Sequence, residues 1–368
     1  MTPEQQKIEA YLQMIEKRGT LDGRFANVTR IDSVGGGGFF SLVCTARDLT
    51  TNNEVVLKFF RPDRYIPSDA YRWESFERES KILEMLTGCR DIVTLVAPQA
   101  EFVETPIPHI PLEIRFAYYA VEKADKSLAD EIAVGGNKAE ELLVMFRAIV
   151  RSVQRIHSRQ IAHRDLKPGN FLVMSGTIKL SDFGTARLMD QTAMALLTNY
   201  TYPPGDQGYC SPEMMACLHD VDPKFAFHGD FFAVGAILFE MFTGVNLGVQ
   251  LFGPQLLTAL TQPMLIVPRD QRIEIFNQII PSISKKYLLP TIDAINFGLP
   301  ACICQQLNRL FRELCELDYR KRLTNYSSIF RGIDTCLLIL RNETRYIAWQ
   351  KEKQKRRTAR MARNGVSK

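Results

Sequence analysis

The sequence contains no long uninterrupted apolar run. No stretch reaches the roughly 18 consecutive apolar residues that a membrane-spanning helix needs, and residues 1–20 mix charged and apolar positions instead of forming the apolar segment of a secretory signal. With 46% hydrophobic and 24% charged residues among 368, the chain can bury a sizeable core as one large or two ordinary domains. We therefore expect a soluble, cytoplasmic protein without a transmembrane segment.

Cysteine patterns typical of metal sites or disulfide frameworks are also missing. The eight cysteines are scattered, include no C-x-x-C pair and have no histidines at zinc-ligand spacing. We therefore expect reduced thiols that serve the fold.

The net charge of +5 is concentrated at one end of the chain. Residues 351–368 contain eight Lys and Arg against one acidic residue, which leaves 38 basic and 40 acidic residues elsewhere. Like charges repel one another and extend a chain, so we expect a solvated helical extension or a disordered end. The alternative is weak electrostatic contact with an anionic partner such as nucleic acid, a membrane or an acidic protein.

Hydrophobic spacing divides the chain into a strand-rich beginning and a helical remainder. Residues 1–20 have the pattern of a short amphipathic helix. Short β-type runs punctuated by glycine follow over 28–65, and helical spacing over 70–88 ends at a glycine. Two more strand-like runs precede a long helical part, at 91–97 and 112–122, with helices predicted at 139–158, at 229–243 and in several segments from 270 to 340. This order predicts an α+β fold with two lobes.

The densest chemical signal lies at residues 161–173, which read IAHRDLKPGNFLV and are followed by LSDFG at 180–184. Phosphoryl transfer needs a carboxylate to orient the attacking hydroxyl, a cation near the transferred phosphate and oxygen ligands for Mg²⁺. These residue types occur here in the expected order, as Asp165, Lys167, Asn170 and Asp182.

From about residue 28 to residue 340 the sequence resembles the protein kinase family. In the glycine loop SVGGGGFFSLV, Gly36 and Gly38 match the first two family glycines, Phe40 the aromatic tip, Ser41 the third glycine and Val43 the valine. Glycines let backbone N–H groups approach phosphates closely, although a glycine run is also a common flexible loop.

The resemblance continues fifteen residues later, at EVVLK. Lys58 matches the strand lysine that holds the α- and β-phosphates, and Glu79 matches the helix glutamate that pairs with it. Glu77 is a near competitor, but it falls on a different face of the helix.

The segment AYYAVEKADKSLAD resembles the strand and hinge of a kinase. The resemblance implies that Val121 lies at the back of the nucleotide pocket and that backbone groups from Glu122 to Ala124 bond adenine. A half-buried strand and a turn is the alternative interpretation. Leu172 is also expected to bind the cofactor, and Val56 stands where the family has an alanine above the adenine, which adds bulk.

Further signatures concern the scaffold and regulation. His163 and Phe183 are expected to pack behind the site, and Arg164 is suited to bind a phosphorylated activation segment. That segment would run from Asp182 to Glu213. Its predicted features are an ion pair of Glu213 with Arg322 and possible phosphorylation sites at Thr192, Thr198, Tyr200, Thr201 and Tyr202. Beyond it, Asp230 resembles the aspartate that opens the central helix of the large lobe.

Two regions depart from the family pattern. Asp206 stands where a threonine usually contacts the catalytic aspartate and lysine, so the local alignment shifts or that contact is lost. Residues 245–300 match no family signature and are unusually apolar, which indicates internal packing or an exposed surface for a protein partner or a second copy.

The resemblance implies a bilobal fold with four parts. These are an N-terminal helical extension (1–27), a small β-rich lobe with one key helix and the hinge (28–124), a larger helical lobe (125–345, including 245–300) and the basic tail (346–368).

The implied activity is that of a Ser/Thr protein kinase that uses ATP and Mg²⁺, acts on protein substrates and is regulated through its activation segment. Asp165 is the expected catalytic base, Lys58 and Lys167 are catalytic cations, and Asn170 and Asp182 are metal ligands. Lys167 favours serine or threonine acceptors over tyrosine and protein over small-molecule acceptors. The main rival hypothesis is a pseudokinase-like binding or scaffold module, motivated by Val56, Asp206 and residues 245–300.

Overall fold

The computed structural model describes residues 3–31, 41–60, 66–104, 113–189, 204–293, 299–342, 348–349, 351–353 and 355–356. The chain forms two compact units. The first consists of Met1–Leu128 and Gly169–Ala186, and the second of Ala129–Pro168 and Arg187–Lys368. The chain therefore crosses between the units three times, and each unit is built from two separate segments.

The first unit is built on a six-stranded antiparallel sheet with the strand order β1-β2-β3-β4-β6-β5. The strands are β1 (Thr20–Leu21), β2 (Phe25–Arg30), β3 (Ser41–Asp48), β4 (Glu54–Phe60), β5 (Leu95–Glu104) and β6 (Ile114–Glu122). The strand predicted over 91–97 was placed too early, because only Ile92 makes an isolated bridge, to Leu180, and the ladder begins at Leu95.

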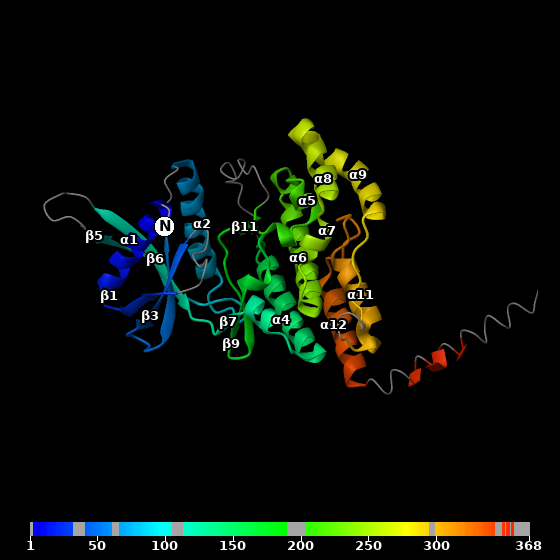
Figure 1. The fold of residues 1–368 in the computed structure, drawn as a ribbon, viewed down its shortest axis with the longest axis horizontal. Helices are drawn as coiled ribbons and strands as arrows, with labels where there is room; N and C mark the ends of the chain where they lie inside the picture. Colours follow the sequence, from blue (N-terminus) through cyan, green and yellow to red (C-terminus); the bar gives the residue numbers. More distant parts are fainter. Residues whose placement is uncertain are drawn as a thin grey trace, which may run out of the picture. The chain divides into compact units, whose positions relative to one another are not determined.

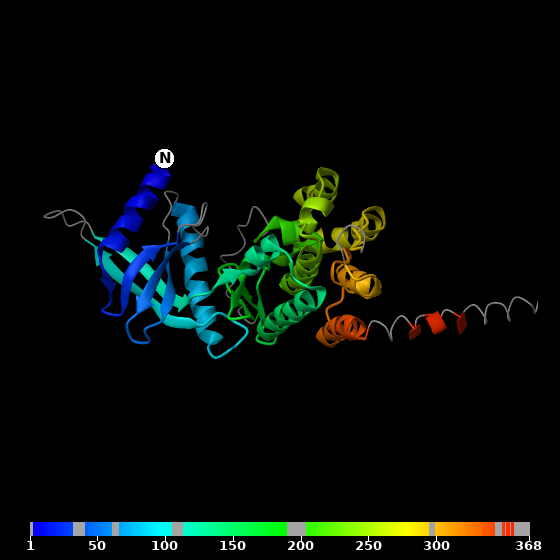
Figure 2. The same ribbon diagram turned by 60° about the horizontal axis from the view of Figure 1, so that its bottom comes forward.

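Alternation along the central strands gives the sheet two different faces. Successive side chains point to opposite sides of a strand. One face carries the buried Leu42, Cys44, Leu57, Phe59 and Tyr118, which form a core with Ile15 of α1 (Pro3–Lys17). Rings of Tyr11 and Phe116 lie 5.0 Å apart in the same core. The predicted N-terminal helix therefore packs on the sheet, as Figures 1 and 2 show.

The other face of the sheet meets α2 (Ile66–Met85). The ring of Phe76 on this helix lies 5.0 Å from that of Tyr119 in β6, and Phe76, Ile82 and Leu83 are buried. Glu79 is on the same helix. The packing of α2 thus fixes the position of this glutamate relative to the strands.

A small sheet completes the first unit. Its order is β10-β9-β7, with β7 (Lys126–Ser127), β9 (Phe171–Met174) and β10 (Thr177–Leu180). The turn between β9 and β10 is Ser175-Gly176, and both residues have positive φ, 47° and 78°, as a tight two-residue hairpin requires. The short helix η1 (Pro168–Asn170) leads into β9, so Asn170 and the residues after β10 lie at the same end of the hairpin.

The second unit is mainly helical. Its longer helices are α3 (Leu128–Val134), α4 (Ala139–His157), α6 (Lys224–Thr243), α8 (Pro254–Ile266), α9 (Arg272–Lys286), α11 (Ala301–Leu314) and α12 (Tyr326–Arg341). Shorter elements are β8 (Ile161–Ala162), β11 (Arg187–Leu188), η3 (Gln207–Tyr209), α5 (Pro212–Met215), η4 (Leu218–Asp220), α7 (Leu247–Leu251) and η5 (Arg269–Gln271).

Helix α6 is the core of this unit. It is the one helix in the described part of the chain that is long and apolar enough to cross a membrane, but 83% of its apolar window is buried inside the protein, as in the core helix of a globular domain. It begins at Lys224, so Asp230 lies in its second turn rather than at its start, contrary to the prediction. The predicted α+β class, with a β-rich part and a larger helical part, is confirmed.

The apolar region 245–300 supplies α7, α8 and α9. Leu256, Leu260, Phe276 and Ile280 are buried in the unit, which accounts for part of the apolar character. Leu265, Ile266 and Leu288 are instead 79%, 85% and 81% exposed. Internal packing thus accounts for some residues of the region, while others are exposed, and a partner for the exposed residues remains a prediction.

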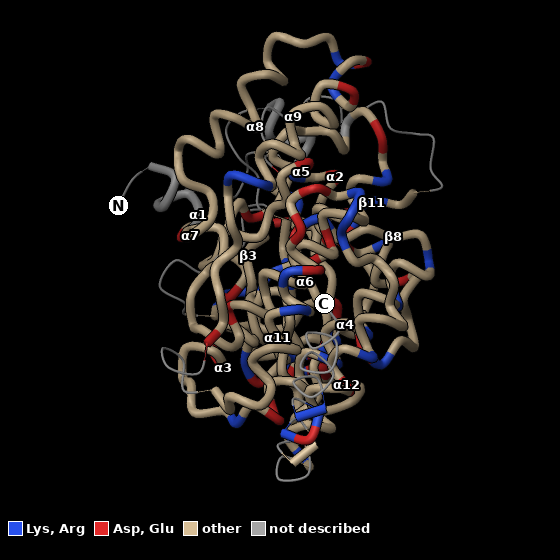
Figure 3. Tube along the Cα trace, turned by 90° about the vertical axis from the view of Figure 1, so that its right-hand side faces the viewer, with Lys and Arg blue, Asp and Glu red and all other residues tan. Residues whose placement is uncertain are grey.

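Outside the basic tail, charged residues are distributed without segregation by sign. Figure 3 shows Lys and Arg interspersed with Asp and Glu along the described chain, in agreement with the near-equal basic and acidic counts outside the last eighteen residues. The described residues of the basic tail, at 348–349, 351–353 and 355–356, are helical and exposed. All eight cysteines are free thiols.

Candidate active site

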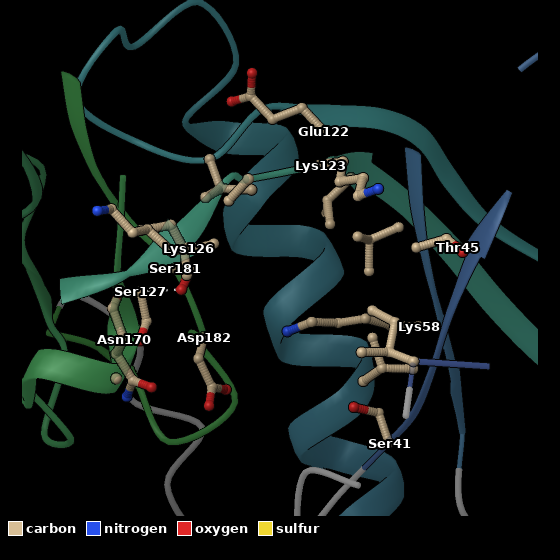
Figure 4. Close-up of a pocket in the computed structure, with 18 of the residues that line it drawn as sticks. Ser41, Thr45, Lys58, Glu122, Lys123, Lys126, Ser127, Asn170, Ser181 and Asp182 are labelled. Carbon is tan, nitrogen blue, oxygen red and sulfur yellow. Dashed lines mark hydrogen bonds between the residues drawn. The ribbon is translucent and has the colours of Figure 1, made fainter. Parts of the chain in front are cut away.

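The first unit contains a pocket of about 730 Å³, a size typical of small-molecule sites. Figure 4 shows the Lys58 side chain extending into it from β4, with Asn170 and Asp182 across from it. Every described residue that was predicted to bind cofactor or metal lines this pocket: Ser41, Val43, Val56, Lys58, Glu79, Val121, Glu122, Ala124, Asn170, Leu172 and Asp182. Gly36 and Gly38 lie outside the described residues.

Strand register explains one wall of the pocket. Thr45 on β3, Val56 on β4 and Val121 on β6 lie directly opposite one another, and Val43 lies opposite Lys58. Because neighbouring positions alternate between faces, these five residues share the face that points away from the α1 core. An apolar wall of valines with a lysine at one end can cover a flat base while placing a cation near phosphates.

Lys58 is held by Glu79. Its Nζ lies 2.6 Å from Glu79 Oε1, and both side chains are largely buried. Burial alone would lower the pKa of Lys58, but the charges of Glu79 and Asp182 outweigh it and raise that pKa. Lys58 therefore carries its charge into the pocket. Glu77, the competing candidate, instead lies 3.7 Å from Lys81 on its own helix.

Tyr119 is a buried neighbour of this ion pair. Burial and the charges of Glu79 and Asp182 raise its pKa well above the ordinary value, so its hydroxyl stays protonated. The tyrosine packs on Phe76 of α2 and thereby links the helix that carries Glu79 to the strand beside Lys58.

The carboxylate of Glu122 connects the end of β6 to its surroundings. It accepts hydrogen bonds from the Thr94 backbone N–H and from Lys179 Nζ, both at 2.6 Å. The Glu122 N–H in turn donates to the Thr94 carbonyl at 3.0 Å. The side chain of Glu122 thus stabilises the segment predicted to be the hinge, while the backbone of Glu122 to Ala124 remains the predicted adenine contact.

The candidate metal ligands lie at one end of the β9–β10 hairpin. The N–H and the hydroxyl of Ser181 both donate to the Asn170 carbonyl, at 2.9 and 3.0 Å. This fixes the backbone beside Asp182, whose φ of 62° is unusual for a residue other than glycine. In the described part of the chain no three His, Cys, Asp or Glu residues form a metal cluster. One carboxylate and one carboxamide fit Mg²⁺, which commonly takes one or two carboxylates and completes its shell with water and substrate phosphates.

The remaining predicted catalytic residues belong to the second unit. Asp165 Oδ2 lies 3.0 Å from Lys167 Nζ, and Asp165 Oδ1 accepts a 2.8 Å hydrogen bond from the Asp206 backbone N–H. Asp206 therefore contacts Asp165 through its backbone N–H, while its side chain accepts from the Gly208 N–H at 2.8 Å.

Asp230 organises the loop before Asp165. Its two carboxylate oxygens accept the backbone N–H groups of His163 and Arg164 at 2.7 and 2.8 Å, and it lies 2.9 Å from His157 Nε2. His163 and Phe183 are fully buried, as predicted for residues that pack rather than react.

The predicted ion pair of Glu213 with Arg322 is present and fully buried. The Arg322 guanidinium donates to both carboxylate oxygens of Glu213, with a 3.0 Å bond to Oε2. It also donates to the carbonyls of His228 and Glu316. This network fixes the end of the predicted activation segment against the helices of the second unit.

Sequence reasoning missed several pocket residues. Thr45 could have been found, because it lies two positions after Val43 and so on the same face of the strand. Asp125 and Ser181 adjoin predicted residues. Arg30 and Ser127 carry no signal, since only the folding of β2 and β7 brings them to the pocket.

Comparison with known proteins places this geometry in context. A family model described as "Protein kinase domain" matches residues 29–331. The mitogen-activated protein kinase HOG1 of Ustilaginoidea virens is 29% identical over 210 residues, which cover 57% of this chain and 52% of that protein. Mitogen-activated protein kinase 9 of Oryza sativa subsp. japonica is 30% identical over 223 residues, which cover 60% of this chain and 29% of that protein.

A probable serine/threonine-protein kinase of Corynebacterium efficiens is 28% identical over 215 residues, which cover 58% of this chain and 30% of that protein. The chain thus spans about half the length, or less, of these relatives.

Proposed function

Because the chain belongs to the protein kinase domain family, we propose that it transfers the γ-phosphoryl group of ATP, in the presence of Mg²⁺, to serine or threonine hydroxyls of proteins. The observation that carries this proposal is that the Lys58–Glu79 ion pair lies in one pocket together with Asn170 and Asp182.

The nucleotide would be held by the pocket of the first unit. Val43, Val56, Val121 and Leu172 offer apolar surface for the base, and Lys58 supplies a fixed positive charge for the α- and β-phosphates. Asn170 and Asp182 would hold Mg²⁺, which neutralises charge on the phosphates when bound. Lys58 and Mg²⁺ would thus place positive charge beside the phosphates, and no residue of the pocket would need to react.

The acceptor would be oriented by Asp165. In phosphoryl transfer the protein mainly positions groups and stabilises charge, so a carboxylate held from both sides suits the task. Lys167, at 3.0 Å from Asp165, is placed to steady the transferred group. The Corynebacterium efficiens relative, named as a probable serine/threonine-protein kinase, supports serine and threonine as acceptors.

Phosphorylation of the activation segment is proposed to regulate the enzyme. Arg164 and Arg187 both lie near the buried His219, and Arg187 donates to the His219 carbonyl at 2.9 Å. Two guanidinium groups in one region favour a phosphoryl group. The candidate acceptors Thr192, Thr198, Tyr200, Thr201 and Tyr202 lie outside the described residues.

A protein partner is proposed to bind residues 245–300. The support is a groove of about 840 Å³ on α8 and the end of α9, which the exposed Leu265 and Ile266 help to line. Binding of an anionic partner by the basic tail and a cytoplasmic location remain predictions from composition.

The activity would be tested by transfer of labelled γ-phosphate from Mg-ATP, with the protein itself and a generic basic protein as acceptors. We expect label on serine or threonine with the wild type, and a loss of about 100-fold or more with Asp165→Asn, the size of effect that removal of a general base has elsewhere. A wild type that binds Mg-ATP but labels neither acceptor would contradict the proposal and favour a binding module.

A further inference from the structure

The two oxygens of the Asp165 carboxylate have different partners within the second unit. Oδ2 lies near the flexible side chain of Lys167, at 3.0 Å, whereas Oδ1 accepts from the backbone N–H of Asp206 at 2.8 Å. A backbone donor has little freedom of its own, because the chain on either side fixes it. The Asp206 N–H therefore determines the orientation of the carboxylate more strictly than Lys167 does.

This hydrogen bond depends on a close approach of two backbone segments at Gly205. Gly205 has a φ of 86°, and a Cβ at this position would lie 2.3 Å from the Arg164 carbonyl oxygen and 3.1 Å from Asp165 Oδ1. Real Cβ atoms essentially never come that close to a backbone atom. Only glycine lets the segment reach the loop that carries Asp165.

Neither side of this contact can move away easily. On one side, the Arg164 N–H is bonded to Asp230 Oδ1 at 2.8 Å, and Asp230 is only 1% exposed. On the other, the Asp206 carbonyl accepts from the Tyr209 N–H at 3.1 Å, and the Tyr209 hydroxyl donates to Glu240 of α6. Both segments are thus anchored to the same buried helix.

The geometry points to Gly205 as a positioning residue, which allows the Asp206 N–H to hold the Asp165 carboxylate in its reactive orientation. The inference rests on the proposed function, in which Asp165 orients the acceptor hydroxyl. A backbone amide here takes the place of the side-chain hydroxyl that the sequence lacks at position 206. Whatever displaces the segment before Tyr209 would therefore also misplace the catalytic carboxylate.

The test compares Gly205→Ala with Gly244→Ala in the full chain. Gly244 also has a positive φ, 69°, lies in the same unit and has nothing within 4 Å of its would-be Cβ. Both variants place an alanine at a positive φ, but only the first collides with the Arg164 carbonyl. Any difference between them reports the close approach.

We expect Gly205→Ala to lower kcat by about 10- to 100-fold, the effect of a misplacement near 1 Å, with KM for ATP unchanged. Gly244→Ala should retain the wild-type kcat. Hydrogen bonds to a carboxylate favour its ionised form, so loss of the Asp206 bond should also move the acidic limb of the pH–kcat profile to higher pH in Gly205→Ala alone. Equal kcat and equal pH profiles for the two alanine variants would overturn the inference.

A second readout does not require activity. The carboxyl pKa of Asp165, followed by ¹³C NMR and assigned with Asp165→Asn, should rise in Gly205→Ala and stay unchanged in Gly244→Ala. An inactive wild type with this pKa difference would reject the proposed function and support the positioning role, whereas an active wild type without the difference would do the reverse.

If Gly205→Ala does not fold, Asp206→Pro removes the same donor at a φ of −81° that proline accepts. It should raise the same pKa, and an unchanged value would reject the role.

Discussion

Glu77 and Glu79 stand two positions apart on α2 and meet different surroundings. Glu79 is 6% exposed and reaches Lys58 at 2.6 Å, while Glu77 pairs with Lys81 on the helix surface at 3.7 Å. The helical period separates the two carboxylates by about 200°. The pair offers a variant and a matched control on one helix.

Glu79→Gln should weaken the hold on Lys58 and lower kcat/KM for ATP by about 10- to 100-fold, the range that loss of a charge-assisted hydrogen bond produces. Glu77→Gln should leave kcat/KM unchanged, because its partner is exposed. Steady-state kinetics with varied ATP would measure both. Equal effects of the two substitutions would contradict the role of Glu79.

The buried pair of Glu213 and Arg322 should matter for stability. Arg322→Met leaves the Glu213 carboxylate buried without its partner, which costs about 3–5 kcal/mol in comparable sites. Arg341→Met removes the exposed pair with Glu140, and such pairs contribute at most about 1 kcal/mol. Urea unfolding of both variants provides the comparison, and a difference below about 1 kcal/mol would be inconsistent with the buried network.

The lowered pKa of the buried His219 predicts that stability depends on pH. Burial, followed by the charges of Arg164, Arg187 and Arg269, lowers its pKa to about 3. In the unfolded chain His219 binds a proton near pH 6.5, whereas in the folded chain it stays neutral until about pH 3. Protonation therefore favours the unfolded chain, so the free energy of unfolding is highest above about pH 6.5 and falls as the pH falls toward 3. Between pH 7 and pH 5 the loss from His219 is about 2 kcal/mol.

The corresponding measurement is urea unfolding of wild type and His219→Gln at the two pH values. The substituted protein should lose less stability on acidification, since the side chain no longer titrates. An identical pH dependence in both proteins would show that His219 is not the responsible group.

At the scale of elements, α1 contributes to the β-rich unit through its buried face. Ile15 is fully buried in the core under the sheet, and Arg30 at the end of β2 bonds Glu9 and Glu16 of the helix. Ile15→Ala should therefore destabilise the protein by about 2–5 kcal/mol. Val134→Ala, at a residue that is 80% exposed, should change it by no more than about 0.5 kcal/mol. Thermal unfolding would distinguish them, and equal midpoints would mean that α1 does not stabilise this unit.

Elements with a clear period could be predicted from the sequence, and those without one could not. The alternation of β4 and the spacing of α4 were sufficient to place both. The start of α6 was misplaced because nearly every face of this helix is buried, so no amphipathic period marks its first turns. The start of β5 was misplaced because Ile92 forms only an isolated bridge, to Leu180. This contact joins residues far apart in the sequence, so local spacing does not show it.

The same distinction applies to the candidate site. Residues within linear motifs, such as Lys58, Asp165 and Asp182, could be identified because their chemistry and spacing are local. The contact of Asp206 with Asp165 could not, because it uses a backbone N–H that every residue except proline has. Pocket residues such as Arg30 depend on the register and on the closure of the sheet.

At the scale of the molecule, the proposed catalytic groups are divided between two units. Lys58, Asn170 and Asp182 belong to the first, and Asp165 and Lys167 to the second. Under the proposed function, we therefore expect substitutions to separate nucleotide binding from acceptor handling. Asp165→Asn should bind Mg-ATP with nearly the wild-type Kd and lose phosphotransfer, whereas Lys58→Met should weaken binding itself by about 10-fold or more. Calorimetric titration beside the transfer assay measures both, and a large loss of ATP affinity in Asp165→Asn would contradict the division.

The first unit combines two segments, one that ends at Leu128 and one that begins at Gly169. A protein expressed as two pieces, 1–128 and 129–368, would have its sheet on one piece and the hairpin with Asn170 and Asp182 on the other. Strand β7 at the end of the first piece pairs with β9 of the second. Reassembly of the pieces would thus restore the pocket that neither contains alone. Under the proposed function, the chain could serve as a split reporter whose reassembly is read out by binding of fluorescent ATP.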